Sequence, residues 1–453
     1  MQVIIELVSS NKIMEAVMKK IIIFVLFMAL NLSAQSWYTY TPANTNGKLP
    51  DNNVDCLATD ANGNVWIGTY YSGLVKFDGT NWTNYTTSNS PLKDKTIVDV
   101  AVDKQGNVWV ANYGNGVFRF NPSTNTWTQF TKESGALTDN ITYKLLVDNQ
   151  GYIWVGVRVT SYNSPGVLRY DGVNWVQGPV FQDNFNSYSC EALGVDKNGN
   201  VWCGTRIGLY KYDGTNWAVY GKSNTQGGLG GDYIRTIAGD ASGNVWVGTT
   251  DYVNNQTVGG GLSKFNGSTW TIYKSSTHPI DDFVSAIAFR NNDVWIGTGF
   301  CGQIGNYKGI YVYNGTTFTS YQSTTTFPGN CVNDIVVDKN NNVWIGSAFG
   351  LTKYGTIVSV QPDDAIPTEF KITAYPNPFN PTTTIDYEIA KSGLYTLKIF
   401  NTIGEEIETL FSGELSAGFY KSQFDASRLA SGIYYCRLTG DNITISTKLV
   451  LIK

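Results

Sequence analysis

The sequence predicts an all-β protein, in which a seven-bladed β-propeller closed by its N-terminal strand is followed by a small immunoglobulin-like β-sandwich. Two observations lead to this prediction. A Val-Trp-x-Gly segment, or a close variant, recurs seven times at spacings of 43, 45, 48, 44, 49 and 49 residues. After residue 371 the repeat gives way to shorter alternating strands. A period of about 40 to 50 residues, built from strand and turn residues, is typical of four-stranded propeller blades.

Each copy of the repeat contains the same four strands. In the first copy an apolar run at 54–59 leads through a turn into the second strand at 65–68, and the third and fourth strands follow at 73–79 and 81–85. The second strand of each copy carries a tryptophan. These tryptophans are Trp66, Trp109, Trp154, Trp202, Trp246, Trp295 and Trp344. Seven copies predict seven blades over residues 35–355.

The ring can be closed from the sequence. The seventh copy ends with its third strand at 350–354, and the segment after it lacks a tryptophan. Residues 36–40, at the other end of the propeller, match the fourth strand of the first copy. Pairing the first and last strands in one blade removes two unpaired sheet edges. We therefore predict that residues 36–40 complete the seventh blade.

The thirteen tryptophans are all accounted for by the repeat. Seven lie in second strands, and the other six lie in fourth strands, where Phe318 takes the seventh place. The fourth-strand residues are Trp37, Trp82, Trp127, Trp175, Trp217 and Trp270. Because the positions repeat, we interpret these rings as packing between blades and not as a stacking platform for sugars or bases.

An aspartate opens the turn between the first and second strands in six copies. These residues are Asp60, Asp103, Asp148, Asp196, Asp240 and Asp338. Spaced Asp and Asn oxygens also suit calcium, but no Glu follows at a fixed distance. An Asp that caps its own turn, with Gly supplying a positive φ, explains the pattern better. We predict no metal site and no cofactor.

Composition and the N-terminal segment indicate an exported protein. Charged residues make up 15% of the chain, aromatic residues 14%, and the net charge of -4 provides no basic surface for nucleic acid. A basic start at 18–20, an apolar run at 21–30 and small residues before Gln35 predict a signal peptide at 18–34. Residues 1–17 resemble an over-extended start upstream of Met18. No segment is apolar for long enough to predict a transmembrane helix.

The six cysteines are not spaced as a disulfide framework. Cys203 replaces an apolar residue of a second strand and Cys436 lies in an apolar strand, so we expect both to be buried. Cys301 follows the second strand of the sixth copy, and Cys331 precedes the first strand of the seventh. Both loops emerge on one face of a propeller, and the pair is our candidate disulfide.

A second domain is predicted after a linker. Residues 356–371 contain Pro362 and Pro367 and show no strand pattern, whereas residues 372–453 contain short alternating strands. The expected strands are 382–389, 394–400, 405–410, 418–425, 432–438 and 443–452. This number of short strands in about 80 residues suggests an immunoglobulin-like sandwich.

The motifs of this second unit resemble the type A sorting domain of the bacterial type IX secretion system. The matching segments are Tyr-Pro-Asn-Pro-Phe at 375–379 and residues 397–405, 415–420, 431–435 and 448–450. The resemblance implies engagement with the type IX machinery and passage through the outer membrane. It also implies removal of the domain in many members, with attachment at the cell surface. The expected location is extracellular or at the outer-membrane surface.

The blades resemble the two-component regulator propeller repeat, on the evidence of residues 60–69 and 73–78. In that family the repeats form periplasmic sensor domains that precede a membrane helix and a histidine kinase. In this sequence a sorting domain follows the propeller instead. We therefore expect the chain to share the propeller fold of that family but not its role in kinase signalling.

No catalytic constellation is predicted. The one histidine, His278, stands before Pro279 in a loop, and neither a histidine metal site nor a Ser-His-Asp triad can be assembled around it. We therefore expect a recognition protein that binds a glycan or a protein. The alternative is a carbohydrate-active or lyase-type enzyme that uses carboxylates on the same scaffold.

The predicted binding surface is the face that carries the loops between second and third strands. These loops are long in blades 3, 5 and 6, at 157–165, 250–260 and 299–308. Residues that vary within a repeated frame are where ligand contacts are expected. Following the second strands, they are Tyr70, Tyr113, Arg158, Arg206, Tyr252, Phe300 and Phe349. At the start of the first strands, near the channel mouth, they are Asp55, Tyr143, Glu191, Arg235 and Asn333.

Overall fold

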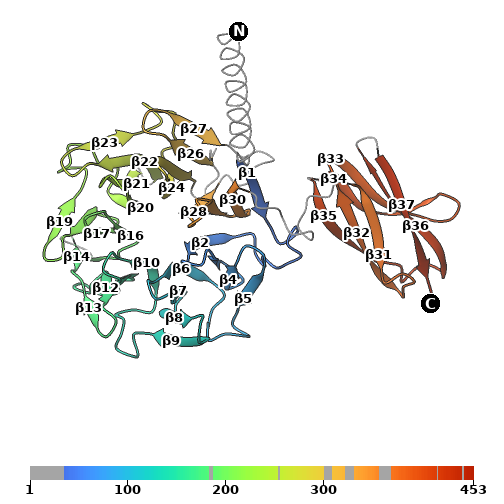
Figure 1. Cartoon of the computed structure of the whole chain (residues 1–453), viewed down its shortest axis with the longest axis horizontal. Coiled ribbons are helices and arrows are strands. Elements are labelled where there is room, and N and C mark those ends of the chain that lie inside the picture. The colour runs from blue at the N-terminus through green and yellow to red at the C-terminus, as the bar shows by residue number, and fades with distance from the viewer. Residues whose placement is uncertain are drawn as a thin grey trace, which may run out of the picture.

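The computed structural model describes residues 35–182, 187–253, 256–299, 309–321, 331–356, 369–415, 417–440 and 443–452. All regular secondary structure in these residues is β-strand, as predicted. Seven four-stranded antiparallel sheets form a ring around a central channel, and two further sheets form a sandwich (Figure 1).

The strands of each blade follow the chain from the channel outward. Blade 1 is β2 (Val54–Thr59), β3 (Val65–Thr69), β4 (Leu74–Phe77) and β5 (Trp82–Tyr85). Blade 2 is β6 (Ile97–Val102), β7 (Val108–Asn112), β8 (Val117–Asn121) and β9 (Thr126–Phe130). Blade 3 is β10 (Thr142–Val147), β11 (Ile153–Val157), β12 (Val167–Tyr170) and β13 (Trp175–Gln177).

The remaining blades have the same order. Blade 4 is β16 (Ala192–Val195), β17 (Val201–Gly204), β18 (Leu209–Tyr212) and β19 (Trp217–Tyr220). Blade 5 is β20 (Tyr233–Gly239), β21 (Val245–Val253), β22 (Gln256–Phe265) and β23 (Trp270–Tyr273). Blade 6 is β24 (Val284–Arg290), β25 (Asp293–Thr298), β26 (Ile310–Tyr313) and β27 (Phe318–Tyr321). Blade 7 is β28 (Val332–Val337), β29 (Val343–Ser347), β30 (Gly350–Thr356) and β1 (Gln35–Tyr40).

The ring closes through blade 7. β1 pairs antiparallel with β30, from Gln35 opposite Thr356 to Tyr40 opposite Leu351. The seven innermost strands contact one another in sequence order, and β28 of the last blade contacts β2 of the first. The predicted closure by the N-terminal strand is therefore confirmed, and the blade sheets leave no seam.

Aromatic rings join each blade to the next. The tryptophan of every second strand packs against the third-strand aromatic residue of the following blade. The pairs, with ring-centroid distances, are Trp66–Phe120 (6.1 Å), Trp109–Tyr170 (5.6 Å), Trp154–Tyr212 (5.6 Å), Trp202–Phe265 (6.1 Å), Trp246–Tyr313 (6.0 Å), Trp295–Tyr354 (5.0 Å) and Trp344–Phe77 (5.8 Å). The seventh pair returns to blade 1. The rings are core, as expected from their repeat-locked positions.

The repeat glycine is explained by the approach of the neighbouring blade. A Cβ atom added to Gly204 would lie 2.5 Å from Cγ2 of Ile234, and one added to Gly297 would lie 2.4 Å from Cγ1 of Val332. Ile234 and Val332 belong to the first strands of the next blades. A side chain at the glycine would hold these strands apart, so the inner ring packs tightly only with a small residue there.

The structure corrects one expectation about the loops. Residues 250–260 were expected to form a loop, but β21 and β22 continue their ladder as far as Val253 opposite Gln256. The insertion is thus an extension of the blade 5 hairpin, because backbone pairing satisfies the polar groups of the inserted residues. A small hairpin of β14 (Phe181–Gln182) and β15 (Ser187–Tyr188) also precedes blade 4.

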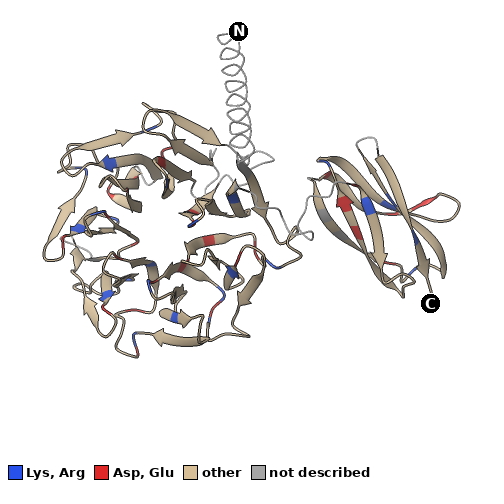
Figure 2. Ribbon diagram, in the orientation of Figure 1, with Lys and Arg blue, Asp and Glu red and all other residues tan. Residues whose placement is uncertain are grey.

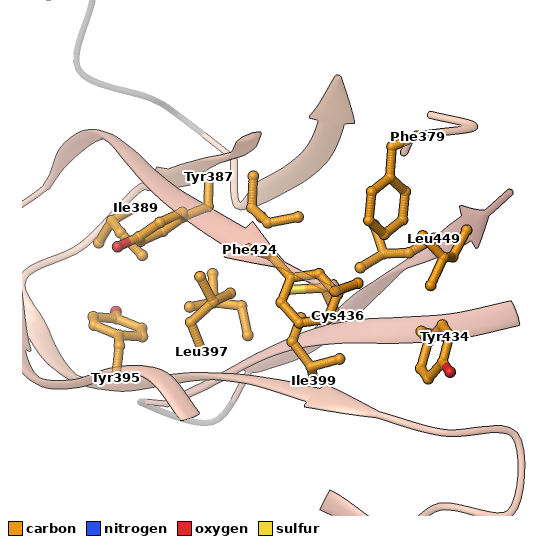
Figure 3. Close-up of a cluster of buried hydrophobic side chains, with 14 of the residues drawn as sticks. Phe379, Tyr387, Ile389, Tyr395, Leu397, Ile399, Phe424, Tyr434, Cys436 and Leu449 are labelled. Carbon is orange, nitrogen blue, oxygen red and sulfur yellow. The ribbon is translucent and has the colours of Figure 1, made fainter. Parts of the chain in front are cut away.

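The C-terminal strands form two facing sheets. One has the order β31 (Lys371–Tyr375), β32 (Thr382–Ile389) and β35 (Gly418–Asp425). The other has the order β34 (Glu406–Leu415), β33 (Gly393–Phe400), β36 (Gly432–Gly440) and β37 (Ile443–Leu451). Alternate residues point inward and form one hydrophobic cluster that includes Tyr387, Leu397 and Phe424 (Figure 3). This arrangement agrees with the predicted sandwich.

The sequence analysis expected Cys203 and Cys436 to be buried and Cys301 and Cys331 to form a disulfide, and the structure bears on part of this. Cys203 and Cys436 are buried free thiols, as are Cys56 and Cys190. Cys331 is disulfide-bonded. Cys301, the sixth cysteine, lies outside the described residues, so its pairing with Cys331 stays a prediction. The signal peptide at 18–34 also lies outside them.

Candidate ligand-binding site at the channel mouth

A recurring irregularity of the first strand positions the residues at the channel mouth. In six blades the pairing of the first and second strands shifts by one residue near its start, for example between Val54 and Cys56 in blade 1. The skipped residues are Asp55, Val98, Tyr143, Arg235, Ser285 and Asn333. A bulge of this kind re-aims a side chain away from the alternation of the strand. In blade 4, Glu191 occupies the corresponding place just before β16.

The bulged residues of these six blades line one cavity of about 600 Å³. It is lined by Asp55, Tyr70, Thr96, Val98, Tyr113, Ile141, Thr142, Tyr143, Arg235, Ser285, Gly299, Val332 and Asn333. Of the residues that the sequence singled out, the structure thus brings together Asp55, Tyr70, Tyr113, Tyr143, Arg235 and Asn333. They come from five blades, which only closure of the ring makes neighbours.

The acidic and amide side of the cavity belongs to blades 1 and 7. Asn333 Nδ2 donates to the carbonyl oxygen of Val54 at 2.9 Å and lies 3.5 Å from Oδ1 of Asp55. Burial, together with the nearby charge of Asp51, raises the pKa of Asp55 to about 7. This carboxyl group therefore takes up or releases a proton near neutral pH and can donate or accept a hydrogen bond.

The basic side is built around Tyr233. The guanidinium groups of Arg206 and Arg235 lie 5.2 Å and 4.8 Å from the centroid of its ring. Glu191 accepts a hydrogen bond from Arg206 Nε at 2.8 Å and another from the Tyr233 hydroxyl. Burial raises the pKa of Tyr233, so its hydroxyl stays protonated and keeps donating to Glu191. Glu191 and Arg206 thus support this wall, while Arg235 lines the cavity itself.

Tyrosines supply the apolar part of the lining together with Val98, Ile141 and Val332. Tyr70 and Tyr113, which follow the second strands of blades 1 and 2, are 43% and 53% exposed. Tyr143 extends the tyrosine lining in blade 3. Burial, and then the charge of Glu191, raises the pKa of Tyr143, which keeps this hydroxyl neutral. Exposed tyrosines at a concave surface offer both a ring face and a hydrogen-bonding hydroxyl.

Sequence reasoning missed a layer of charge directly below the mouth. Lys144 Nζ contacts Oδ1 of Asp99 at 2.8 Å, and Oδ2 of Asp99 accepts the backbone N–H of Leu145. Asp334 accepts the backbone N–H of Leu57 at 2.9 Å, and burial raises its pKa to about 6. Each aspartate therefore satisfies a backbone donor of the following blade. The sequence did offer one signal for these charged residues: Asp99, Lys144 and Asp334 each directly follow a bulged residue.

None of the other predicted residues that the structure describes lines the cavity. Arg158 pairs with Asp139 at 3.2 Å, and Tyr252 and Phe349 are exposed on the loop face, at 68% and 50%. Phe300 is outside the described residues. His278 contacts the rings of Tyr273 and Phe318 and is not part of the cavity lining.

The turn aspartates are occupied by protein donors. Oδ1 of Asp148 accepts the backbone N–H groups of Gln150 and Tyr152, and Oδ2 accepts Trp154 Nε1. Asp60, Asp103, Asp196, Asp240 and Asp338 bond in the same way. Both oxygens thus serve the turn and the strand, which supports the interpretation as turn chemistry. No group of three acidic, histidine or cysteine side chains in the described part of the chain is arranged to hold a metal ion.

Two families match the sequence. Residues 373–453 match the secretion system C-terminal sorting domain, and residues 48–71, 91–114, 228–251 and 326–349 match the two component regulator propeller. The chain is a propeller of two-component regulator repeats with a type IX sorting domain. No curated protein sequence matches it.

Solved propellers share the fold of this regulator-type propeller. The extracellular domains of two proteins of B. thetaiotaomicron, both described as hybrid two component systems, match with TM-scores of 0.56 and 0.50 at 17% and 15% identity. Each match covers 92% of this chain, which spans 57% and 59% of those chains. A streptogramin B lyase matches with a TM-score of 0.52 at 14% identity, over 70% of this chain and 97% of the lyase. At these identities the likeness concerns the fold.

The sorting domain indicates export of this propeller protein to the cell surface or beyond, by engagement with the type IX secretion machinery. Among the described residues, none belongs to a helix with the length and hydropathy needed to cross a membrane.

Proposed function

We propose that this protein is an exported recognition protein that binds a glycan, or a segment of a protein, in the cavity at the channel mouth. The proposal rests on which positions of the repeat vary between blades. The turns, tryptophans and glycines that build the blades are repeated, whereas the bulged residues that line the cavity differ from blade to blade. A frame held constant around a variable concave lining is the arrangement expected of a ligand site.

The shape of the site favours a glycan over a protein partner. A cavity of about 600 Å³ is of the size that encloses a small ligand or a chain end. Protein partners usually require a much broader contact surface. Exposed tyrosine rings can stack on the C–H faces of a sugar, while Asp55, Asn333 and Ser285 can hydrogen-bond its hydroxyl groups.

Binding of the full chain to a glycan array and to a peptide array tests the proposal. Tyr113→Ala should weaken binding of any ligand found there by about tenfold, which corresponds to the loss of one aromatic contact. Tyr252→Ala is the matched control, because Tyr252 is also an exposed tyrosine that follows a second strand on the same face, but it lies outside the cavity. Equal loss in both variants would assign binding to the wider face, and no binder on either array would refute the proposal.

The alternative, a carbohydrate-active enzyme, has one observation in its favour. Asp55 lies in the cavity with a pKa of about 7, which suits a general acid. Glycoside hydrolysis usually requires a second carboxyl group across the bond, and Asp55 is the one carboxyl group among the described residues that line the cavity. Recognition is therefore the better-supported function. Turnover of a bound glycan that is lost in Asp55→Asn, with binding retained, would favour the enzyme.

A further inference from the structure

The charged groups of the cavity are separated by sign. Asp55 and Asn333 belong to adjacent blades 1 and 7, whereas Arg235 belongs to blade 5. Blade 5 stands three or four blades from blade 1 around a ring of seven, so the carboxyl and guanidinium groups face the cavity from opposite sides. Figure 2 shows the charged residues of the blades as scattered blue and red segments on a mostly tan ribbon. A ligand in this cavity therefore meets a hydrogen-bonding wall on one side and a basic wall on the other.

The basic wall is pre-organised. Arg235 and Arg206 both lie against the ring of Tyr233, and Tyr233 is in turn held by its hydrogen bond to Glu191. Arg206 is tied to Glu191 at 2.8 Å, which leaves Glu191 engaged with two donors. A guanidinium presents its donors in a planar fork that matches the geometry of a carboxylate or sulfate group, and a ring against its face helps to fix its orientation. Stacking also reduces the entropy lost when an anion binds.

We infer that Arg235, supported by Tyr233 and Arg206, forms an anion subsite, and that the ligand is an acidic saccharide. The inference rests on the proposed function and specifies its ligand class. The carboxylate or sulfate group of the sugar contacts Arg235, its ring stacks on the tyrosines, and its hydroxyl groups reach Asp55 and Asn333. A neutral sugar would leave the guanidinium without a partner from the ligand, and a cationic ligand would be repelled by it.

Matched probes test the inference on the full chain. Uronic-acid oligosaccharides, their carboxyl-reduced neutral counterparts and sulfated oligosaccharides are compared by calorimetry, with a quaternary ammonium compound as the cationic probe. The acidic members should bind at least about tenfold more tightly than the neutral ones, as expected for a charge-assisted hydrogen bond. The difference should shrink in high salt. Comparison of carboxylate with sulfate probes then identifies which anion the subsite takes.

Arg235→Gln should remove that preference, lowering affinity for the acidic probe about tenfold while leaving the neutral probe within about twofold. Arg235→Lys keeps the charge and should retain part of the preference, which guards against loss through misfolding. Arg428→Gln, an exposed arginine of the sorting domain, is the control of equal charge change.

The outcomes are distinct. Neutral glycans that bind as tightly as acidic ones, or preference for the cationic probe, would overturn the anion subsite but keep the proposed function. An acidic preference that persists in Arg235→Gln would also overturn it. If no saccharide binds, both the inference and glycan recognition fail.

Discussion

Oδ2 of Asp148 accepts the indole N–H of Trp154 at 2.7 Å, while Oδ1 of the same carboxylate caps the turn between them. The bond recurs in six of the seven blades, at Nε1–Oδ2 distances up to 3.1 Å. Blade 6 departs from it. There Arg290 pairs with Asp293 across a two-residue turn, and Trp295 Nε1 is buried without a hydrogen-bond partner among the described residues. One carboxylate thus links the turn of each regular blade to its core tryptophan.

Asp148→Ala should destabilise the propeller by about 1–3 kcal/mol, because it leaves the buried indole N–H and two turn N–H groups without an acceptor. Chemical denaturation would measure the change. Asp171→Ala, which removes a solvent-exposed turn aspartate with backbone contacts to Val173 and Asn174, is the matched control and should cost far less. Equal losses would mean that the tryptophan bond contributes nothing.

Deletion of residues 35–40 should destabilise the fold by several kcal/mol, on the order of a large core lesion, because it exposes the edge of β30. Trp37→Ala should reproduce part of the loss, since Trp37 packs on Tyr354, Tyr321 and Trp295. Tyr71→Ala, an exposed aromatic in blade 1, is the control. An unchanged melting temperature in the truncated protein would contradict closure by β1.

Removal of residues 369–453 should leave the propeller folded but retained in the periplasm, because the sorting signal and the blades have separate hydrophobic cores. Cell fractionation with circular dichroism of the retained protein would test both parts. The truncated protein at the cell surface in normal amounts would refute the role of the sorting domain.

Non-reducing peptide mapping by mass spectrometry should find Cys301 linked to Cys331. Cys331 is disulfide-bonded, and Cys56, Cys190, Cys203 and Cys436 are buried free thiols. The bond would hold the blade 6 loop near the entrance of blade 7, and export into an oxidising compartment permits it. A peptide that links Cys331 to any other cysteine, or a free thiol at Cys331, would contradict the pairing.

Asp55→Asn should stabilise the protein at neutral pH but not in acid. The pKa of Asp55 rises from 3.8 to about 7 on folding, so the folded state binds more protons between these values and loses stability as the pH rises through them. The amide removes this penalty. The gain should be absent below about pH 4, grow up to about pH 7 and then level off at roughly 2 kcal/mol after solvent screening. A gain in stability that is independent of pH would contradict the raised pKa of Asp55. Asp171→Asn serves as the control.

The blades and the sandwich could be predicted from the sequence because each strand carries its own local signal. Apolar alternation and the Val-Trp-x-Gly segment or a close variant recur in every blade, and the capped turn recurs in six of them. The closing strand was recognisable because Trp37 fills the one empty place in the repeat. For the same reason Tyr70, Tyr113 and four of the six bulged residues could be singled out, because they vary where the frame does not; Val98 and Ser285 were missed.

Which residues form the site was decided by the tertiary structure. Asp55 and Asn333 are 278 residues apart and meet only because the ring closes, and Arg206, Tyr233 and Glu191 assemble across two blades. The Asp99–Lys144 pair likewise depends on a neighbouring blade and is not encoded by the repeat. Local periodicity determines strands and turns, because backbone geometry and burial act over a few residues. Contacts around a channel depend on which side chains the closed ring brings face to face.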